Sequence, residues 1–398
     1  METFFRYEDD SLRFGQKSIR LSDLTAKAEG PLYVYDLQLA KSRLAALKSQ
    51  LPEAKVFYAL KANSHPAVLQ ALLAGGAGAD VVSGGEIRRA LECGFKPQQI
   101  IYSGVGKTDR EIRFALAEGI EQINVESIPE LRRIAELAKE MKLRARVAFR
   151  LNPDVDIKTH PYIATGLAEN KFGLELSQII HIEEILTQSS AQLELVGISQ
   201  HLGSQMLQFE GLREGLRRLR PVYEALKVRF PTLRKFDAGG GLGILYDQDR
   251  PDLEQKMLED YAAVVRSELK GIDGQLQLEP GRWLVGHAGV LLTQVVFVKQ
   301  TSHRTFVIVN SGMNHLIRPA LYQAKHRILP LQRRASSKVA KFDIVGPICE
   351  SADFFAKEYE MPEVQSGDWL AIVDAGAYGF SMANTYNLQD LPTEIAIS

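Results

Sequence analysis

Short apolar runs alternate with amphipathic segments from about residue 30 to residue 280, and this alternation limits the fold of the chain more than any other feature. A series of strand, helix and strand indicates parallel pairing with right-handed crossovers. The predicted strands are Val56–Leu60, Ala79–Val82, Ile100–Ser103, Gln122–Val125, Arg146–Arg150, Val196–His201, Lys235–Ala238 and Gln275–Glu279.

Eight such strands over about 250 residues predict an α/β fold with a TIM-type (β/α)8 barrel. Amphipathic segments such as Pro129–Glu140, Leu207–Arg229 and Leu253–Lys270 supply predicted helices between the strands. A doubly wound sheet is the alternative fold, but no glycine-rich turn follows the first predicted strand.

The pattern changes after Glu279. Helical spacing becomes scarce, and runs rich in Val, Leu and Thr predict a C-terminal β domain, either a sandwich or a barrel. We expect residues 28–281 to form the barrel, and residues 282–398, together with 1–27, to form the β domain. The predicted strands of this part are Gly289–Lys299, Thr305–Val309, Phe342–Val345, Trp369–Asp374 and Glu394–Ile397.

Composition excludes several classes of protein. The chain has 48 basic and 49 acidic residues and lacks a basic stripe, so no nucleic-acid partner is expected. No apolar run is long enough to cross a bilayer, and charges come too early for a signal peptide. Cys93 and Cys349 make no disulfide framework. We therefore expect a soluble cytoplasmic protein that does not associate with membranes.

Lys61 stands at the tip of the first predicted barrel strand. A lysine held against apolar surface has a lowered pKa and a nucleophilic amine, which is the kind that forms Schiff bases. Most lysines at strand ends are solvated surface residues, so Lys61 alone does not decide between the two interpretations.

Other unusual residues follow the last three predicted strands of the barrel. They are His201, the glycine run Asp237–Gly243, and the sequence Glu279-Pro280-Gly281-Arg282. Each has an ordinary structural explanation: a hydrogen-bonding histidine, a tight turn, and a β-turn with surface charges. Function is favoured because the carboxyl ends of barrel strands meet at one face, where active sites lie.

These residue types together match the needs of pyridoxal phosphate. Glycine amides after a strand can cradle a phosphate, and an imidazole can stack on a flat ring. A carboxylate can pair with a protonated ring nitrogen, and a lysine amine can hold an aldehyde. The sequence therefore predicts pyridoxal phosphate as the cofactor and no metal ion.

These motifs also resemble those of a known family, the fold-type III pyridoxal-phosphate decarboxylases of basic amino acids. The resemblance rests on Tyr58-Ala59-Leu60-Lys61-Ala62-Asn63, His201-Leu202-Gly203-Ser204-Gln205, the glycine run and Glu279–Arg282. Three more segments resemble the diaminopimelate decarboxylases in particular: residues 159–166, Arg318-Pro319-Ala320-Leu321-Tyr322, and residues 346–353.

The resemblance implies roles for individual residues. Lys61 would bind the cofactor covalently, His201 would stack on its ring, and Glu279 would pair with its ring nitrogen. Phosphate would be bound by Ser204, Gly241 and the backbone of Gly281 and Arg282, with Tyr378 near the cofactor. Arg282, Arg318, Tyr322 and Glu350 would bind the substrate, meso-diaminopimelate, and Cys349 would donate a proton after carbon dioxide leaves. Cys349 and Glu350 would come from the partner subunit of a homodimer.

Charge gives this substrate independent support. Diaminopimelate has two amino-acid ends, so a site must neutralise a distal carboxylate, and arginine does so with two parallel hydrogen bonds. A decarboxylase of ornithine or lysine needs no such arginine. Arg318 could instead be a surface residue beside a helix, and Cys349 a buried apolar filler.

Two segments depart from the family pattern, at Asn310–Asn314 and at Tyr386–Pro392. A related decarboxylase acting on a carboxylated polyamine or a siderophore intermediate is the alternative enzyme. A non-catalytic cofactor-binding homologue is the third possibility, although the presence of both Lys61 and Cys349 speaks against it.

Overall fold

The computed structural model describes residues 4–155, 171–246, 248, 250–334 and 337–398. The chain divides into two compact units. The barrel unit comprises Leu44–Gly243 and Lys256–Gly281, and the β unit comprises Met1–Arg43, Ile244–Gln255 and Arg282–Ser398.

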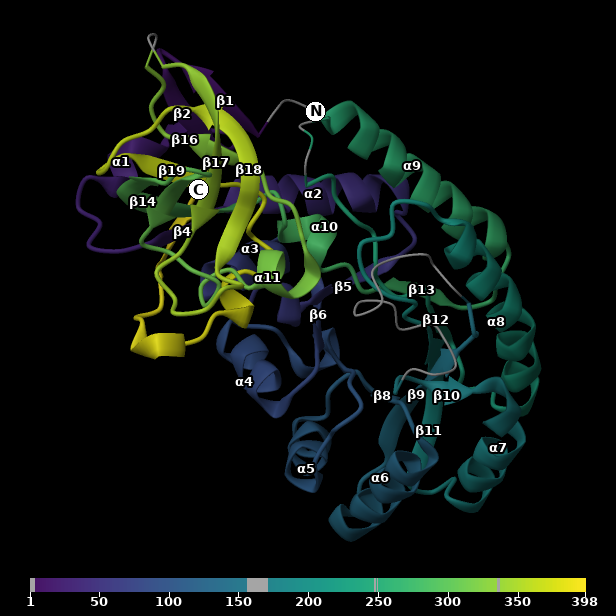
Figure 1. Ribbon diagram of the computed structural model, residues 1–398. Helices are drawn as coiled ribbons and strands as arrows, with labels where there is room; N and C mark the ends of the chain where they lie inside the picture. The colour runs from purple at the N-terminus through teal and green to yellow at the C-terminus, as the bar shows by residue number, and fades with distance from the viewer. Residues whose placement is uncertain (1–3, 156–170, 247, 249, 335–336) are drawn as a thin grey trace. The chain divides into compact units, whose positions relative to one another are not determined.

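The described part of the barrel unit contains a closed ring of eight parallel strands (Figure 1). Pairing of β13 with β5, and of β8 with β9, closes the ring. The predicted TIM-type barrel is therefore confirmed. Its strands are β5 (Lys55–Ala59), β6 (Gly78–Val81), β7 (Ile100–Tyr102), β8 (Gln122–Val125), β9 (Ala145–Asn152), β11 (Leu193–Ser199), β12 (Lys235–Asp237) and β13 (Gln275–Leu278); the short β10 (Leu174–Glu175) adds to β9.

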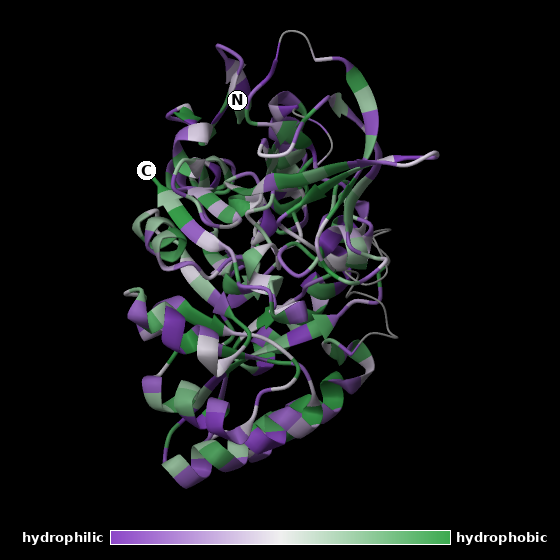
Figure 2. Ribbon diagram, turned by 60° about the vertical axis from the view of Figure 1, so that its left-hand side comes forward, coloured by the Kyte–Doolittle hydropathy of each residue, from purple (hydrophilic) through white to green (hydrophobic). Residues whose placement is uncertain are grey.

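The helices begin where side chains can satisfy their first amide groups. Ser83, Thr108 and Ser127 each accept a hydrogen bond from a backbone N–H in the first turn of the helix that follows. Figure 2 shows hydrophilic and hydrophobic residues alternating along the long helices, as expected for helices with one buried face. The helices are α2 (Leu37–Gln50), α3 (Pro66–Ala74), α4 (Gly84–Glu92), α5 (Asp109–Glu118), α6 (Ile128–Met141), α7 (Ile179–Gln188), α8 (Glu210–Arg229) and α9 (Pro251–Glu268).

The barrel strands are buried along nearly their whole length. Val56, Phe57, Tyr58 and Ala59 of β5 are each at most 2% exposed. Strands with both faces covered form continuous apolar runs, which is why the sequence revealed them. Their carboxyl ends carry the polar residues described below.

The β unit contains a larger mixed sheet and a separate three-stranded sheet. The predicted β domain is therefore confirmed. In the larger sheet most pairs are antiparallel, but β15 pairs with β17, and β4 with β20, in parallel. Its strands are β4 (Leu32–Asp36), β14 (Gly289–Gln300), β15 (Thr305–Val309), β16 (Ile328–Pro330), β17 (Val339–Val345), β18 (Phe354–Pro362), β19 (Trp369–Ile372) and β20 (Thr393–Ile397).

The N-terminal segment folds within the β unit. Strands β1 (Phe5–Glu8), β2 (Ser11–Phe14) and β3 (Ile19–Arg20) form the small sheet, and β4, which follows Pro31, joins the larger one. The unit's short helices are α1 (Leu21–Thr25), α10 (Arg282–Val285) and α11 (Arg318–Tyr322). Across the residues described, no helix combines the length and the apolar character needed to cross a membrane.

Candidate active site

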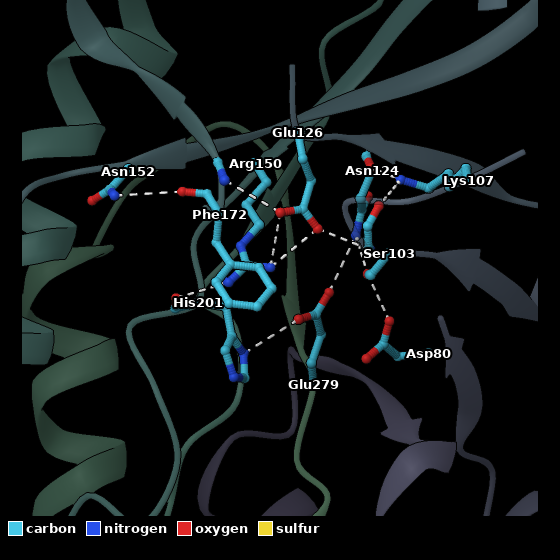
Figure 3. A network of polar contacts seen from close by, with 12 residues as sticks. Asp80, Ser103, Lys107, Asn124, Glu126, Arg150, Asn152, Phe172, His201 and Glu279 are labelled. Atoms are coloured by element: carbon cyan, nitrogen blue, oxygen red, sulfur yellow. Dashed lines mark hydrogen bonds and ion pairs between the residues drawn. The ribbon is translucent and has the colours of Figure 1, made fainter. Parts of the chain in front are cut away.

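Polar side chains gather at the carboxyl ends of the barrel strands. Figure 3 shows several of them, among them His201 and Glu279, joined by hydrogen bonds and ion pairs. Three of the residues predicted from the sequence belong to this part of the barrel unit: Lys61, His201 and Glu279. The structure adds Asp80, Ser103, Asn124, Glu126, Arg150 and Asp237 to them.

Lys61 lies in a 3₁₀ turn, Leu60–Ala62, directly after β5. The turn is apolar, since Leu60 and Ala62 are both buried. The amine itself faces a charge: Nζ lies 3.8 Å from Oδ2 of the buried Asp80. Burial and the neighbouring charge of Glu279 raise the pKa of Asp80 to about 7. Lys61 is therefore held next to a carboxyl group that can gain or lose a proton near neutral pH.

His201 follows β11 and is held as a neutral ring. The backbone N–H of Gly240 donates to its Nδ1 over 3.3 Å, so Nε2 carries the proton. Burial, together with the positive charges of Lys61 and Arg150, lowers the pKa of His201 well below its usual value. A neutral, flat and fixed imidazole is suited to stacking on a planar ring.

Glu279 follows β13 and lies beside a second acid, Asp237, at the end of β12. Asn124 donates to Glu279 over 3.2 Å, and the N–H of Gly239 donates to Asp237 over 2.8 Å. Burial and the charge of Glu279 raise the pKa of Asp237 well above its usual value. Burial also raises the pKa of Glu279, but the charge of Lys61 opposes that rise. Asp237 therefore takes the proton, and Glu279 remains the carboxylate.

A buried ion pair joins two neighbouring strand ends. Nη1 of Arg150 lies 3.1 Å from both carboxylate oxygens of Glu126, and Nη2 donates to the backbone oxygen of His201 over 3.2 Å. Glu126 also accepts from the N–H of Gly104 over 2.8 Å. The pair therefore fixes the backbone that carries His201.

The glycine run after β12 packs backbone against backbone. A Cβ on Gly240 would lie 2.1 Å from the carbonyl oxygen of Glu279. Gly241 has a φ of +102°, and its Cβ would lie 2.6 Å from the oxygen of Gly203. Only glycine allows these approaches. The backbone N–H of Met206 donates to the oxygen of Gly241, and the N–H of Gly243 donates to the oxygen of Met206. These bonds join the loop of the half-buried Ser204 to the loop of Gly241.

This arrangement fits pyridoxal phosphate. It offers an amine, a neutral flat ring, a buried carboxylate and a glycine loop of the kind that binds phosphate, all at the carboxyl ends of barrel strands.

A second cluster lies within the β unit. Arg282, at the start of α10, donates to the hydroxyl of Tyr246 over 2.6 Å, and its Cζ lies 4.8 Å from the ring centre of Tyr378. Arg318, at the start of α11, lies over the same Tyr246, with Cζ 4.2 Å from the ring centre. The structure thus brings together three predicted residues, and Tyr322 ends α11 close by in sequence.

Arg318 is buried without a counter-charge. It is 5% exposed. Among the described residues no carboxylate forms an ion pair with it, and its buried Nε has no hydrogen-bond partner. Burial lowers the pKa of Arg318 accordingly. A buried guanidinium without a carboxylate partner can bind an anion, which offsets the cost of burying its charge.

Cys349 and Glu350 are exposed in the turn between β17 and β18. The backbone N–H of Cys349 donates to Oδ1 of Asn387 over 2.8 Å. The cysteine is thus a surface thiol, so the alternative of a buried apolar filler is wrong. The motif at residues 159–166 lies outside the described residues.

Sequence reasoning missed several of these side chains. Asp80, Glu126 and Arg150 lie within or directly after predicted strands, so charged residues at strand ends were the available signal. Tyr246 and His326 lie in irregular segments, and no pattern in the sequence marked them.

Comparison with known proteins agrees with this site. Residues 37–286 match the family of pyridoxal-dependent decarboxylases, over its pyridoxal binding domain. Diaminopimelate decarboxylase of Aquifex aeolicus is 41% identical over 99% of this chain and 92% of its own length. That of Helicobacter pylori J99 is 42% identical, with 92% and 90% covered.

Solved structures give the same result. The crystal structure of diaminopimelate decarboxylase from Helicobacter pylori complexed with L-lysine has a TM-score of 0.89 at 39% identity, covering 95% of this chain and 94% of that one. The enzyme from M. jannaschii in complex with L-lysine also has a TM-score of 0.89, at 34% identity, with 99% and 92% covered.

The chain belongs to the pyridoxal-dependent decarboxylases, and its cofactor is pyridoxal phosphate. Within that family its relatives over nearly the whole chain are the diaminopimelate decarboxylases, as the motifs indicated.

Proposed function

We propose that this chain decarboxylates meso-2,6-diaminopimelate to L-lysine and carbon dioxide, the last step of lysine biosynthesis by the diaminopimelate pathway. The observation that carries the proposal is the burial of the Arg318 guanidinium without a carboxylate partner among the described residues. A substrate with a second, distal carboxylate supplies the missing charge. Lysine and ornithine, as substrates, do not.

The barrel unit holds the cofactor in this proposal. Lys61 links to its aldehyde, His201 stacks on its ring, and Glu279 pairs with its ring nitrogen. Its phosphate is bound by Ser204, Gly241 and the backbone of Gly281 and Arg282, with Tyr378 near the cofactor. When bound, pyridoxal phosphate supplies an electron sink for the electron pair that carbon dioxide leaves behind.

The protonation states of the site residues support these roles. Glu279 is the carboxylate of its pair with Asp237, so it can keep a ring nitrogen protonated. His201 is neutral, so it places no second positive charge beside that nitrogen. The Arg150–Glu126 pair holds the backbone oxygen of His201, and the N–H of Gly240 holds its ring nitrogen Nδ1.

The substrate roles fall to residues of the β unit. Arg282, Arg318 and Tyr322 bind the carboxylate that is kept, Glu350 binds the distal ammonium, and Tyr378 contacts the substrate. Cys349 donates the proton that replaces carbon dioxide. The exposure of Cys349 and Glu350 supports a homodimer in which these two residues serve the partner's site.

Both parts of the chain contribute to the active site in this proposal. The cofactor-binding part lies within residues 28–281, residues 282–398 with 1–27 contribute to completing the active site, and the reaction takes place in the cytoplasm. No nucleic acid or membrane takes part.

A substrate panel with carbon dioxide release as the readout tests the proposed function. It contains meso-diaminopimelate, lysine, ornithine and a carboxylated polyamine. We expect turnover of diaminopimelate at least about 100-fold above the others, the discrimination that a buried charge pair provides. Preferred turnover of the carboxylated polyamine would overturn the proposal. No turnover at all, with cofactor bound, would indicate a non-catalytic homologue.

A further inference from the structure

His326 holds Arg318 by one hydrogen bond. The imidazole is 4% exposed, its Nδ1 lies 2.8 Å from the backbone oxygen of Val373, and its Nε2 lies 2.8 Å from Nη1 of Arg318. A carbonyl oxygen can only accept, so Nδ1 carries the proton. Nε2 is therefore the acceptor, and the guanidinium is the donor.

The imidazole is also neutral. Burial and the charge of Arg318 lower the pKa of His326 to about 3. A protonated ring would have no lone pair for Arg318 and would place two positive charges in contact. Its tautomer and its charge are thus both set by the two groups on either side.

Tyr246 restricts the guanidinium from a second direction. Its ring lies below Cζ of Arg318, and it meets the ring of His326 edge-on, with centres 5.1 Å apart. One face and one nitrogen of Arg318 are therefore occupied, and Nε is left without a partner among the described residues.

We propose that His326 is a positioning residue that sets specificity for substrates with a distal carboxylate, because it orients Arg318 through a neutral acceptor. An acidic residue at this place would orient the guanidinium equally well. It would also neutralise it, and the substrate carboxylate would lose its attraction. This inference rests on the proposed function and deepens it.

Three variants separate orientation from charge. In His326→Gln, the side-chain oxygen can reach the place of Nε2 and accept from Arg318. His326→Glu has the same shape and reach but adds a negative charge. His326→Asn reaches only the place of Nδ1, so it can keep the bond to Val373 and loses the one to Arg318.

The Michaelis constant for diaminopimelate is the first readout. We expect His326→Asn to raise it roughly 10- to 100-fold, the usual effect of losing one buried hydrogen bond to a charged group. We expect a similar or larger rise for His326→Glu and a rise of no more than about 3-fold for His326→Gln. The turnover number should change much less in all three, and the absorbance of the bound cofactor should stay unchanged.

Product inhibition is the second readout, because lysine keeps the distal carboxylate while 1,5-diaminopentane has none. His326→Asn and His326→Glu should weaken inhibition by lysine and leave inhibition by the diamine unchanged. Equal weakening of both inhibitors would indicate general damage and overturn the positioning role. An unchanged Michaelis constant in His326→Asn would also overturn the positioning role. The same holds if His326→Gln raises the Michaelis constant as much as His326→Glu does.

The two proposals fail in different ways. If the wild-type protein releases no carbon dioxide from diaminopimelate, the proposed function is wrong. If the wild type is active and the variants at position 326 match it on both readouts, only the role of His326 is wrong.

Discussion

His287 and Glu254 form a buried ion pair in the β unit, with Nε2 of the imidazole 2.6 Å from Oε1 of the carboxylate. The other ring nitrogen, Nδ1, lies 2.6 Å from Asp374. Both neighbours are acids that accept, so both nitrogens donate and the ring is an imidazolium. Arg43 and Arg327 complete the network, each pairing with one of the two carboxylates.

This network predicts how stability depends on pH. Burial lowers the pKa of His287, but the charges of Asp374 and Glu254 outweigh burial and raise it above 6.5. Burial likewise raises the pKa of Glu254, but Arg43 and His287 bring it down to about 2. The stabilisation from His287 is therefore complete below pH 6.5 and is lost as pH rises through its raised pKa. The stabilisation from Glu254 is complete above pH 4.5 and is lost as pH falls towards 2.

We expect His287→Gln to destabilise the protein by about 3–5 kcal/mol, because two carboxylates then face each other with less positive charge between them. The deficit should be largest between pH 4.5 and 6.5 and should shrink at higher pH. Urea unfolding of both proteins across this range measures it. A deficit that grows above pH 7 would contradict the charged state of His287.

Arg318 and Arg43 make a matched pair for a stability test. Both are buried, but Arg43 pairs with Glu254 over 2.8 Å and stacks on Trp283, with Cζ 3.6 Å from its ring centre. Arg43→Leu should therefore cost about 3–5 kcal/mol, whereas Arg318→Leu should leave stability unchanged or higher. Thermal unfolding of the two variants measures the difference.

The same Arg318→Leu variant should lose function. Losing the contact to the distal carboxylate should cost roughly 2–5 kcal/mol in the specificity constant for diaminopimelate. Lysine, offered as a substrate, should be poor for the wild type and no worse for the variant. An undiminished specificity constant for diaminopimelate would remove Arg318 from the substrate site.

The barrel could be predicted strand by strand because its strands are buried on both faces. The predicted strand Val56–Leu60 overlaps β5, because Val56 to Ala59 form an unbroken apolar run that is buried on both faces. Strand β18 escaped detection because Lys357, Glu358 and Glu360 lie exposed along it and interrupt the apolar pattern. The N-terminal segment was placed only in general terms, because its three short strands have too few residues for a clear pattern.

Residues that act through distant partners could not be predicted. The proposed role of His326 depends on its hydrogen bonds to Arg318 and Val373, and Val373 is 47 positions away in the chain. The unusual Asn310 likewise gains its explanation from the fold: its Oδ1 accepts from the hydroxyl of Thr293 and the N–H of Gln294, joining β15 to β14. Such tertiary contacts leave no periodic signal in a single sequence.

Lys61→Ala should abolish the visible absorbance of the bound cofactor and lower activity by several powers of ten, since no other amine takes its place. Lys61→Arg is the control. It keeps a positive charge beside Asp80 but cannot form the covalent link, so it should be equally inactive. Retained absorbance in either variant would move the link to another residue.

Glu279→Gln should bind the cofactor and slow decarboxylation by about 100- to 1000-fold, the range found when one preorganised electrostatic contact is removed. Asp237→Asn is the matched control. Asp237 is the protonated member of the pair, and it accepts a hydrogen bond from the N–H of Gly239, which asparagine can do as well. The Asp237→Asn variant should therefore lose far less of the decarboxylation rate than Glu279→Gln. Equal losses would show that the negative charge is shared rather than held by Glu279.

Cys349→Ala should bind substrate and release carbon dioxide but place the replacing proton poorly, because its thiol is the proposed donor. If Cys349 serves the partner's site, mixing Lys61→Ala with Cys349→Ala chains should restore the formation of L-lysine, which is the activity that this test measures. Random pairing makes about half of the dimers mixed, and one of the two sites in each mixed dimer is intact, which gives about a quarter of full activity. Subunit exchange is followed with a fluorescent label on each chain. Absence of recovery despite complete exchange would place Lys61 and Cys349 in the site of a single chain, whereas a quarter of full activity fits only a site that two chains share.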